Sequence, residues 1–204
     1  MNVHSVIIAP PTPPKIPPKK LAILNAALTV FSRDGFHGSP VPPIAKEAGV
    51  GVGTIYRYFA DKESLVNEVF RMAKDGLRQA LFTNLDFSQP AEALFNQFWQ
   101  RLIAFARAEP EAFRFLEIQN HLPYLDNASK AVEREVLLPI MTAISQLQQD
   151  GTITTPMAAE PLIALVWGGV VGMFKYEEAG YFKLDPADLD AAKQLLWAGI
   201  TVRS

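Results

Sequence analysis

The sequence predicts an all-α protein made of a small N-terminal helical domain and a larger C-terminal one. Apolar residues recur at spacings of three and four along most of the chain, which is the period of an amphipathic helix. Alternating strand patterns are missing, and so are repeats of roughly 20 to 50 residues. Asp34-Gly35, Glu109-Pro110 and Asp150-Gly151 are among the pairs that interrupt the helical pattern. We therefore expect helices joined by short turns.

Residues 1–18 are expected to form a flexible arm. Residues 9–18 are mostly proline, which lacks an amide hydrogen and fixes φ, so neither a helix nor a central strand can form there. Such an arm either stays solvated, which we favour, or lies along a nucleic-acid backbone. The apolar run 6–9 is too short for a signal peptide, and no run approaches the roughly 20 residues that span a bilayer. We expect a cytoplasmic protein without a membrane partner.

Residues 19–66 are expected to form the N-terminal domain, with three helices followed by a long helix that leads into the second domain. Ser39 and Asp61 precede two of these helices, and their side-chain oxygens can accept hydrogen bonds from the free amide groups of a first turn. The four helices are expected at residues 20–34, 41–48, 52–59 and 61–85.

Residues 67–204 are expected to form the C-terminal domain, which begins within the long helix. Five further helices follow, and proline or glycine lies close to most of their ends. They are expected near residues 90–108, 110–122, 127–149, 157–179 and 186–202.

The composition excludes several kinds of site. Cysteine is absent, so disulfides, thiolate metal sites and cysteine nucleophiles are excluded together. His4, His37 and His121 lie far apart and lack zinc-ligand spacing. The glycine run 49–53 does not have the spacing of a nucleotide-binding loop, and no nucleophile elbow is present. We expect no metal, no cofactor and no enzymatic activity.

Charge is distributed unevenly along the chain. The formal net charge is -2, but residues 1–85 carry 10 Lys and Arg against 6 Asp and Glu, whereas residues 86–204 carry 9 against 15. Binding to phosphates requires a local excess of positive charge. The N-terminal part is therefore the one to test for contact with DNA.

Residues 41–60 have the spacing of a helix-turn-helix. Ala45 is small where two helices would cross closely, and Gly49 can adopt the positive φ of a tight turn. An ordinary helical hairpin has similar spacing, but residues 53–58 also bring together hydroxyl, guanidinium and backbone groups that suit phosphate oxygens and base edges. DNA binding is the favoured interpretation. The apolar positions of the motif are Ile44, Ala48, Val50, Ile55 and Tyr58.

Residues 22–65 resemble the DNA-binding domain of the TetR family of bacterial repressors. The remaining chain is similar to that family in helix count and length rather than in any motif. Gly51 and Pro42-Pro43 depart from the family pattern, which usually has serine and polar residues there. The motifs that carry the resemblance are Ala26-Ala27, Phe31, Gly35, Ile44-Ala45, Ala48-Gly49-Val50, Gly53-Thr54-Ile55-Tyr56, Tyr58-Phe59 and Lys62-Glu63-Ser64-Leu65.

The resemblance implies a homodimeric transcriptional regulator, namely a repressor that a small-molecule effector releases from a palindromic double-stranded DNA operator. By position it implies that Lys62 meets a phosphate. Partial burial under the hairpin is the alternative for Tyr58. The alternative is a different class of function, namely an all-α small-molecule-binding protein or enzyme with an incidental helical hairpin. The implied DNA-contacting residues are Ser39, Val52, Gly53, Thr54, Tyr56, Arg57, Tyr58 and Lys62.

The helices of the second domain are rich in aromatic residues at spacings typical of a core. The core of a helix bundle can also enclose an apolar pocket with a few polar groups, so we expect a partly apolar effector. Glu117 and His121 would share a helix face, but without a third ligand they do not predict a metal site. The candidate ligand-binding residues are Phe98, Trp99, Phe105, Phe113, Glu117, Asn120, His121, Tyr124, Trp167 and Phe174.

Residues 164–174 are apolar on every side of a helix and include three glycines. Such a helix has to be covered all round, and glycine lets two helices approach closely. We expect this helix and the last one to form a self-complementary dimer face. Burial within a single chain is the alternative.

Overall fold

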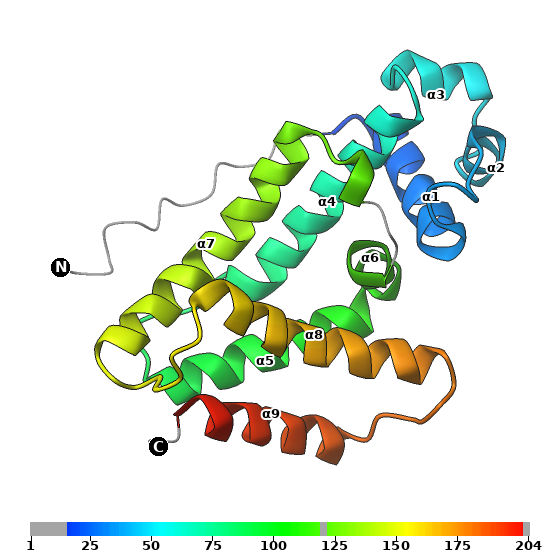
Figure 1. Cartoon of the computed structure of the whole chain (residues 1–204). Helices are drawn as coiled ribbons and strands as arrows, with labels where there is room; N and C mark the ends of the chain where they lie inside the picture. The colour runs from blue at the N-terminus through cyan, green and yellow to red at the C-terminus, as the bar shows by residue number, and fades with distance from the viewer. Residues whose placement is uncertain (1–15, 119–121, 202–204) are drawn as a thin grey trace.

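The computed structural model describes residues 16–118 and 122–201, and within these ranges the chain is helical and contains no strand. Figure 1 shows α1, α2 and α3, here called the head, at one end of α4, and α5 to α9, called the body, along the rest of it, with α7 beside α4 and α6 against α1. The predicted all-α fold is confirmed. The elements are α1 (Pro18–Asp34), α2 (Val41–Glu47), α3 (Val52–Tyr58), α4 (Lys62–Phe82), α5 (Ala91–Ala108), α6 (Pro110–Phe113), η2 (Arg114–Ile118), η3 (Leu122–Tyr124), α7 (Asn127–Gln149), α8 (Ala159–Glu178) and α9 (Pro186–Thr201).

Most helices begin and end within a few residues of the expected positions, and three differences have local causes. Helix α1 begins at Pro18, which is inside the expected arm, while residues 1–15 lie outside the described ranges. Helix α4 ends at Phe82 instead of near Leu85, because the backbone leaves the helical conformation and Asn84 takes a positive φ of 55°. The helix expected at 110–122 is a short α-helix followed by the π-helical turn η2.

Of the two predicted N-caps, Asp61 is correct and Ser39 is wrong. The Asp61 carboxylate accepts a hydrogen bond from the Ser64 amide at 2.6 Å, and the Ser64 hydroxyl accepts one from the Asp61 amide at 3.1 Å, which is a capping box. The N-cap of α2 is Pro40, whose side chain makes no such bond. Ser39 is fully buried, and its hydroxyl donates to the Gly35 carbonyl oxygen at 2.5 Å.

Helix α4 contributes to the cores of both the head and the body. It packs against α1, α5 and α7, and α7 already meets it at Asn67, in its first half. Leu65 and Phe70 are completely buried near the head, and Leu77 and Leu81 are buried in the body. Each such side chain stabilises the fold by about 1.5–3 kcal/mol relative to an exposed position. The orientation of α4 is therefore fixed by apolar packing at both ends.

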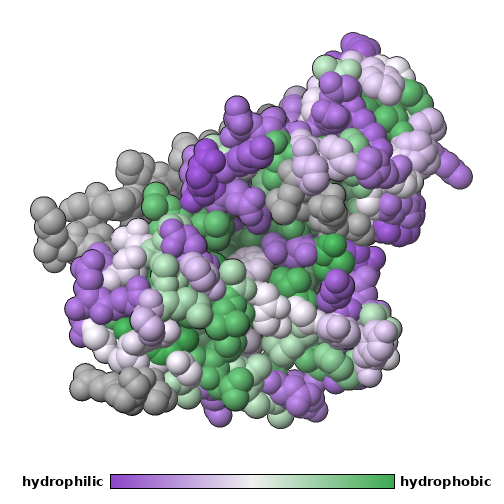
Figure 2. Space-filling model, in the orientation of Figure 1, coloured by the Kyte–Doolittle hydropathy of each residue, from purple (hydrophilic) through white to green (hydrophobic). Residues whose placement is uncertain are grey.

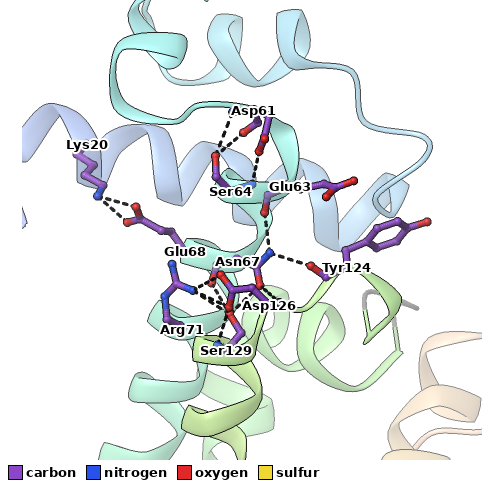
Figure 3. Close-up of polar contacts among 10 residues, drawn as sticks. All are labelled: Lys20, Asp61, Glu63, Ser64, Asn67, Glu68, Arg71, Tyr124, Asp126 and Ser129. Atoms are coloured by element: carbon purple, nitrogen blue, oxygen red, sulfur yellow. Dashed lines mark hydrogen bonds and ion pairs between the residues drawn. The ribbon is translucent and has the colours of Figure 1, made fainter.

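Asn67 joins α4 to the start of α7, and its side chain is hydrogen-bonded on both sides (Figure 3). The amide nitrogen donates to the carbonyl oxygens of Glu63 and Tyr124, both at 2.8 Å. The amide oxygen accepts from the Asp126 backbone N–H at 2.8 Å and from the Ser129 hydroxyl at 2.7 Å. Asn67 is only 3% exposed, so these bonds replace water entirely. These hydrogen bonds fix the position of α7 along the axis of α4.

Asp126 caps α7 beside Asn67. Its carboxylate accepts from the Ser129 backbone N–H at 2.7 Å and lies 3.2 Å from the Arg71 guanidinium. The Ser129 hydrogen bonds, with a further contribution from Arg71, lower the pKa of Asp126. A carboxyl group with a lowered pKa in the folded state stabilises the fold above its ordinary pKa, and the contribution is lost as the pH falls through the folded value. This junction is therefore sensitive to acid.

Replacing Asn67 by alanine is expected to destabilise the protein by roughly 1–3 kcal/mol, because buried groups of Tyr124, Asp126 and Ser129 lose their hydrogen-bond partner. Urea unfolding followed by circular dichroism measures the change in the free energy of unfolding. Asn127→Ala is the matched control, since Asn127 is exposed on α7, and it should change that free energy by less than about 0.5 kcal/mol. Equal losses in the two variants would contradict the role given to Asn67.

Candidate nucleic-acid interface and apolar cavity

The turn between α2 and α3 holds the two helices as a helix-turn-helix. Gly49 has a φ of +64°, which a residue with a side chain rarely adopts, and the Val50 amide donates to the Ala45 carbonyl oxygen at 2.9 Å. Ile44 and Ile55 are 0% and 1% exposed, so each helix contributes an apolar side chain to the core. One face of α3 is thereby packed against the core, and the opposite face is exposed to solvent.

The outer face of α3 brings together six of the predicted DNA-contacting residues at the tip of the head (Figure 1). Tyr56 is 52% exposed, and Arg57 is exposed without an ion pair or hydrogen bond in the part of the chain that the structure describes. Tyr58 is 37% exposed, so its side chain is partly buried and partly accessible. An exposed hydroxyl, guanidinium and helix surface can reach phosphates and base edges in a major groove. The six residues are Val52, Gly53, Thr54, Tyr56, Arg57 and Tyr58.

The other two predicted contacts, Ser39 and Lys62, are engaged inside the head. The Ser39 side chain is buried beneath the loop between α1 and α2. The Lys62 ammonium lies 4.1 Å from the centre of the Phe36 ring and donates to the Phe36 carbonyl oxygen. Burial lowers the pKa of Lys62. To meet a phosphate, Lys62 would have to leave Phe36.

The body contains a cavity of about 100 Å³, at the end farthest from the head. Its walls come from the end of α4, the segment before α5, and helices α5, α7, α8 and α9, and every lining residue is apolar. The aromatic part of the wall consists mainly of Phe95, Phe98, Trp167 and Trp197. Apolar space of this kind suits an apolar ligand group. None of the helices in the described ranges combines the length and hydropathy that a bilayer crossing requires.

Two of the predicted ligand-binding residues, Phe98 and Trp167, lie in the wall of this cavity. Glu117 lies directly behind the wall, where its carboxylate accepts a hydrogen bond from the Trp167 indole N–H at 2.7 Å. Four others are buried elsewhere in the core, and Asn120 and His121 lie outside the described residues. The four core residues are Trp99, Phe105, Phe113 and Phe174.

Tyr124 does not face the cavity but connects the body to the head. Its ring stacks on Phe36 with centroids 3.9 Å apart, and its hydroxyl is hydrogen-bonded to the His37 ring nitrogen Nε2. Phe36 is the same residue that holds the Lys62 ammonium. Tyr124 therefore contacts the loop that supports the helix-turn-helix, and the structure gives it a role in linking the two parts.

Sequence reasoning missed the aliphatic walls of the cavity, such as Leu94 and Ile144, because their spacing is the same as that of core residues. A signal was present for three other wall residues. Phe82, Leu85 and Phe87 are large apolar residues at the end of α4 and in the segment after it, where polar residues are usual. Apolar side chains in such a segment indicate that it covers an interior.

An ion cluster lies behind Trp167, between α4, η2 and α7. The Lys74 ammonium is 3.7 Å from Glu117 Oε1 and 3.3 Å from Glu133 Oε1, and Lys74 is only 6% exposed. Glu117 Oε1 is buried and makes no hydrogen bond to the described residues, and the Lys74 ammonium 3.7 Å away is the cation that faces it.

An apolar stripe on α8 and α9 is left uncovered. Leu165 is 52% exposed and Leu195 is 75% exposed. Gly168 and Gly169 are also exposed, and a Cβ atom added to either would meet nothing within 4 Å. Figure 2 shows mostly apolar and weakly polar residues over the part of the surface where α8 and α9 lie, whereas the head is largely hydrophilic. Burial within a single chain therefore does not account for this face.

Two family models match the chain. The model described as bacterial regulatory proteins, tetR family, matches residues 23–69. The model described as tetracyclin repressor-like, C-terminal domain, matches residues 70–202. Together the two matches extend from α1 to the end of α9.

Curated relatives match over about a quarter of the chain. The fatty acid metabolism regulator protein of Bacillus subtilis is 46% identical over 54 residues, which are 26% of this chain and 28% of that protein. The HTH-type transcriptional regulator RutR of Escherichia coli is 47% identical over 57 residues, which are 28% and 27% of the two chains. The chain thus spans little more than a quarter of the length of these relatives.

Solved structures of similar fold match over both the head and the body. A TetR family protein from Vibrio parahaemolyticus has a TM-score of 0.74 and 26% identity, with 91% of this chain and 100% of that one covered. A TetR family transcription regulator from Marinobacter aquaeolei has a TM-score of 0.77 and 25% identity, with 91% and 96% covered. The FadR protein of Bacillus halodurans, at 20% identity and a TM-score of 0.76, shares the fold, with 93% and 100% covered.

Replacing Gly49 by alanine is expected to lower the free energy of unfolding by about 1–2 kcal/mol, because a Cβ atom is strained at a φ of +64°. Gly53→Ala is the matched control, since Gly53 lies in α3 and a Cβ there meets nothing within 4 Å. Alanine at position 53 should leave stability unchanged or raise it, because alanine favours helix. Urea unfolding of both variants checks the pair, and a stable Gly49→Ala protein would contradict the turn described here.

Proposed function

The chain belongs to the TetR family of bacterial regulatory proteins, and on that premise we propose that it is a homodimeric repressor of transcription. In this proposal the head binds a palindromic DNA operator. Binding of a small, largely apolar effector in the cavity of the body releases the protein from that operator. The observation that carries the proposal is the outer face of α3, which is anchored on one side and presents Tyr56 and Arg57 on the other. Such a helix is the part of a helix-turn-helix that enters the major groove.

Dimerisation follows from how such proteins read DNA. A helix-turn-helix contacts one half-site, and two half-sites lie one helical turn apart, so two copies related by a two-fold axis are needed. The uncovered stripe on α8 and α9 supports this assembly. Glycine in a helix costs about 0.5–1 kcal/mol relative to alanine, and among the described residues no atom lies within 4 Å of a Cβ placed at Gly168 or Gly169. A second copy that packs closely against these two glycines would account for them.

The position of the cavity supports control by an effector. Phe82, the last residue of α4, lines the cavity, while Lys62 at the other end of α4 packs against the head. An effector that binds one position of α4 more tightly than another will shift the population between the two. A coupling of about 1–3 kcal/mol changes DNA affinity by about 5 to 150-fold.

Selection of genomic DNA fragments by the purified protein tests the proposal and yields the operator for measurements of affinity against salt. Arg57→Ala is expected to weaken binding and to reduce the slope of log affinity against log salt by about 0.9, the contribution of one phosphate contact. Arg134→Ala, at an exposed position on α7, is the matched control and should leave both quantities unchanged. Failure to select any fragment, or equal effects of the two changes, would count against DNA binding by α3.

Gly169→Arg is expected to convert the dimer to a monomer, because it places an unpaired charge in a surface that the second copy desolvates, at a cost of about 3–5 kcal/mol. Sedimentation velocity measures the oligomeric state. Gly76→Arg serves as the control: Gly76 is also an exposed helical glycine with nothing within 4 Å of its Cβ position, but it lies on α4. A dimer that survives Gly169→Arg would remove α8 from the interface.

A further inference from the structure

We propose that the effector is an amphipathic cation, with an apolar group in the cavity and a single ammonium group bound by Glu117. The proposal rests on the proposed function, in which the cavity of the body is the effector site. It goes further in naming the charge of the effector and the residue that recognises it.

The wall of the cavity accounts for the apolar group of such a molecule. Every lining residue is apolar, so the cavity offers no hydrogen bond to a polar body. Six of the lining residues are aromatic, namely Phe82, Phe87, Phe95, Phe98, Trp167 and Trp197. Aromatic faces attract cations electrostatically, and indole does so most strongly. The wall therefore favours a positive charge over a negative one near its aromatic side.

Trp167 forms the partition between the cavity and the ion cluster. Its ring lines the cavity, and its indole N–H donates to Glu117 Oε2 at 2.7 Å. Rotation of this one side chain would bring the Glu117 carboxylate into contact with a ligand in the cavity. The ligand group that replaces the indole N–H must itself be a donor, because a carboxylate is an acceptor only.

The charges of the cluster distinguish a cation from other donors. Lys74 is paired with two carboxylates, those of Glu117 and Glu133, so the three groups together carry one negative charge. The lysine is 3.7 Å from Glu117 Oε1, beyond the length of about 2.7–2.9 Å that a charge-assisted hydrogen bond has. The neighbouring guanidinium groups of Arg71 and Arg114 form ion pairs with Asp126 and Glu178, and Arg114 Nε makes no hydrogen bond to the described residues.

Three kinds of ligand head group can be compared on this basis. An ammonium group would donate a hydrogen bond to Glu117 and bring the charge of the cluster to zero. A hydroxyl group would supply the hydrogen bond but leave the negative charge, which is costly in a buried place. A carboxylate would put a third negative charge beside the other two. The expected order of affinity is ammonium, then alcohol, then carboxylate.

The same geometry connects the ligand to α4. Lys74 lies on α4, and the ammonium group of a ligand would compete with it for Glu117. Because like charges repel, occupation of the site weakens the attachment of α4 to η2. The head group of the effector, and not only its apolar part, thus acts on the helix that leads to the DNA-binding face.

The test uses three six-carbon probes that differ only in the head group: hexylammonium, 1-hexanol and hexanoate. The probes are kept to six carbons because the cavity, at about 100 Å³, is smaller than the engineered cavity of about 150 Å³ that holds benzene. Isothermal titration of the full chain at pH 7 without DNA gives the three dissociation constants. Hexylammonium is expected to bind about tenfold or more tightly than 1-hexanol, as one charged hydrogen bond predicts, and hexanoate most weakly. Equal affinities, or tightest binding of hexanoate, would overturn the proposal.

Variants locate the preference for the cation. Glu117→Gln should abolish the advantage of hexylammonium and leave the affinity for 1-hexanol within about twofold of wild type. Glu135→Gln, an exposed glutamate on α7, is the control and should keep the advantage. If Glu117→Gln does not unfold cooperatively, Glu117→Asp replaces it, because it keeps the charge but withdraws it by one methylene. An undiminished preference for hexylammonium in the folded Glu117 variant would overturn the assignment.

The outcomes separate this inference from the proposed function. If 1-hexanol binds and hexylammonium shows no advantage, the cavity remains an effector site and only the cation assignment fails. If none of the three probes binds, both the site and the assignment fail. DNA binding is measured independently of all three, by the Arg57→Ala and Arg134→Ala pair.

Discussion

Burial of α4 in an apolar core that is continuous from the head into the body is the constraint on which the rest of the structure depends. Leu65 and Phe70 pack with the head, and Leu77 and Leu81 pack with the body, so neither part can be placed without the other. Packed interiors switch between discrete arrangements and do not deform smoothly. A displacement of α4 in the body must therefore be accommodated in the head. The polar residues Asn67 and Lys74 sit along the buried side of this helix and fix its height against α7 and η2.

The features that sequence predicts well are those with local causes. The capping box of Asp61, the positive φ of Gly49 and the apolar period of each helix depend on residues within one or two turns. These signals place nearly every helix and the helix-turn-helix itself. The outer residues of α3 follow from them, because once Ile55 faces inward the positions on either side of it face out.

What sequence could not predict depends on contacts between distant segments. Lys62 has the position of a phosphate-binding lysine, but its ammonium is held by Phe36, 26 residues earlier. Tyr124 lies in the sequence of the body, but its ring stacks on Phe36 of the head. The cavity walls are aliphatic residues that look like core, and nothing local marks which part of a core is incompletely filled. The π-helical turn that places Glu117 behind Trp167 likewise has no signature in the apolar period.

The positions of the tryptophan side chains make intrinsic fluorescence a probe of the body. The chain has three tryptophans, Trp99, Trp167 and Trp197, and all of them belong to the body. Trp167 and Trp197 line the cavity, and the indole N–H of Trp167 donates to the carboxylate of Glu117. The wavelength of indole emission responds to such a contact. Tryptophan fluorescence, excited selectively over that of tyrosine, therefore originates in the body and not in α3, so the state of the cavity can be followed in real time while the head is free or bound to DNA.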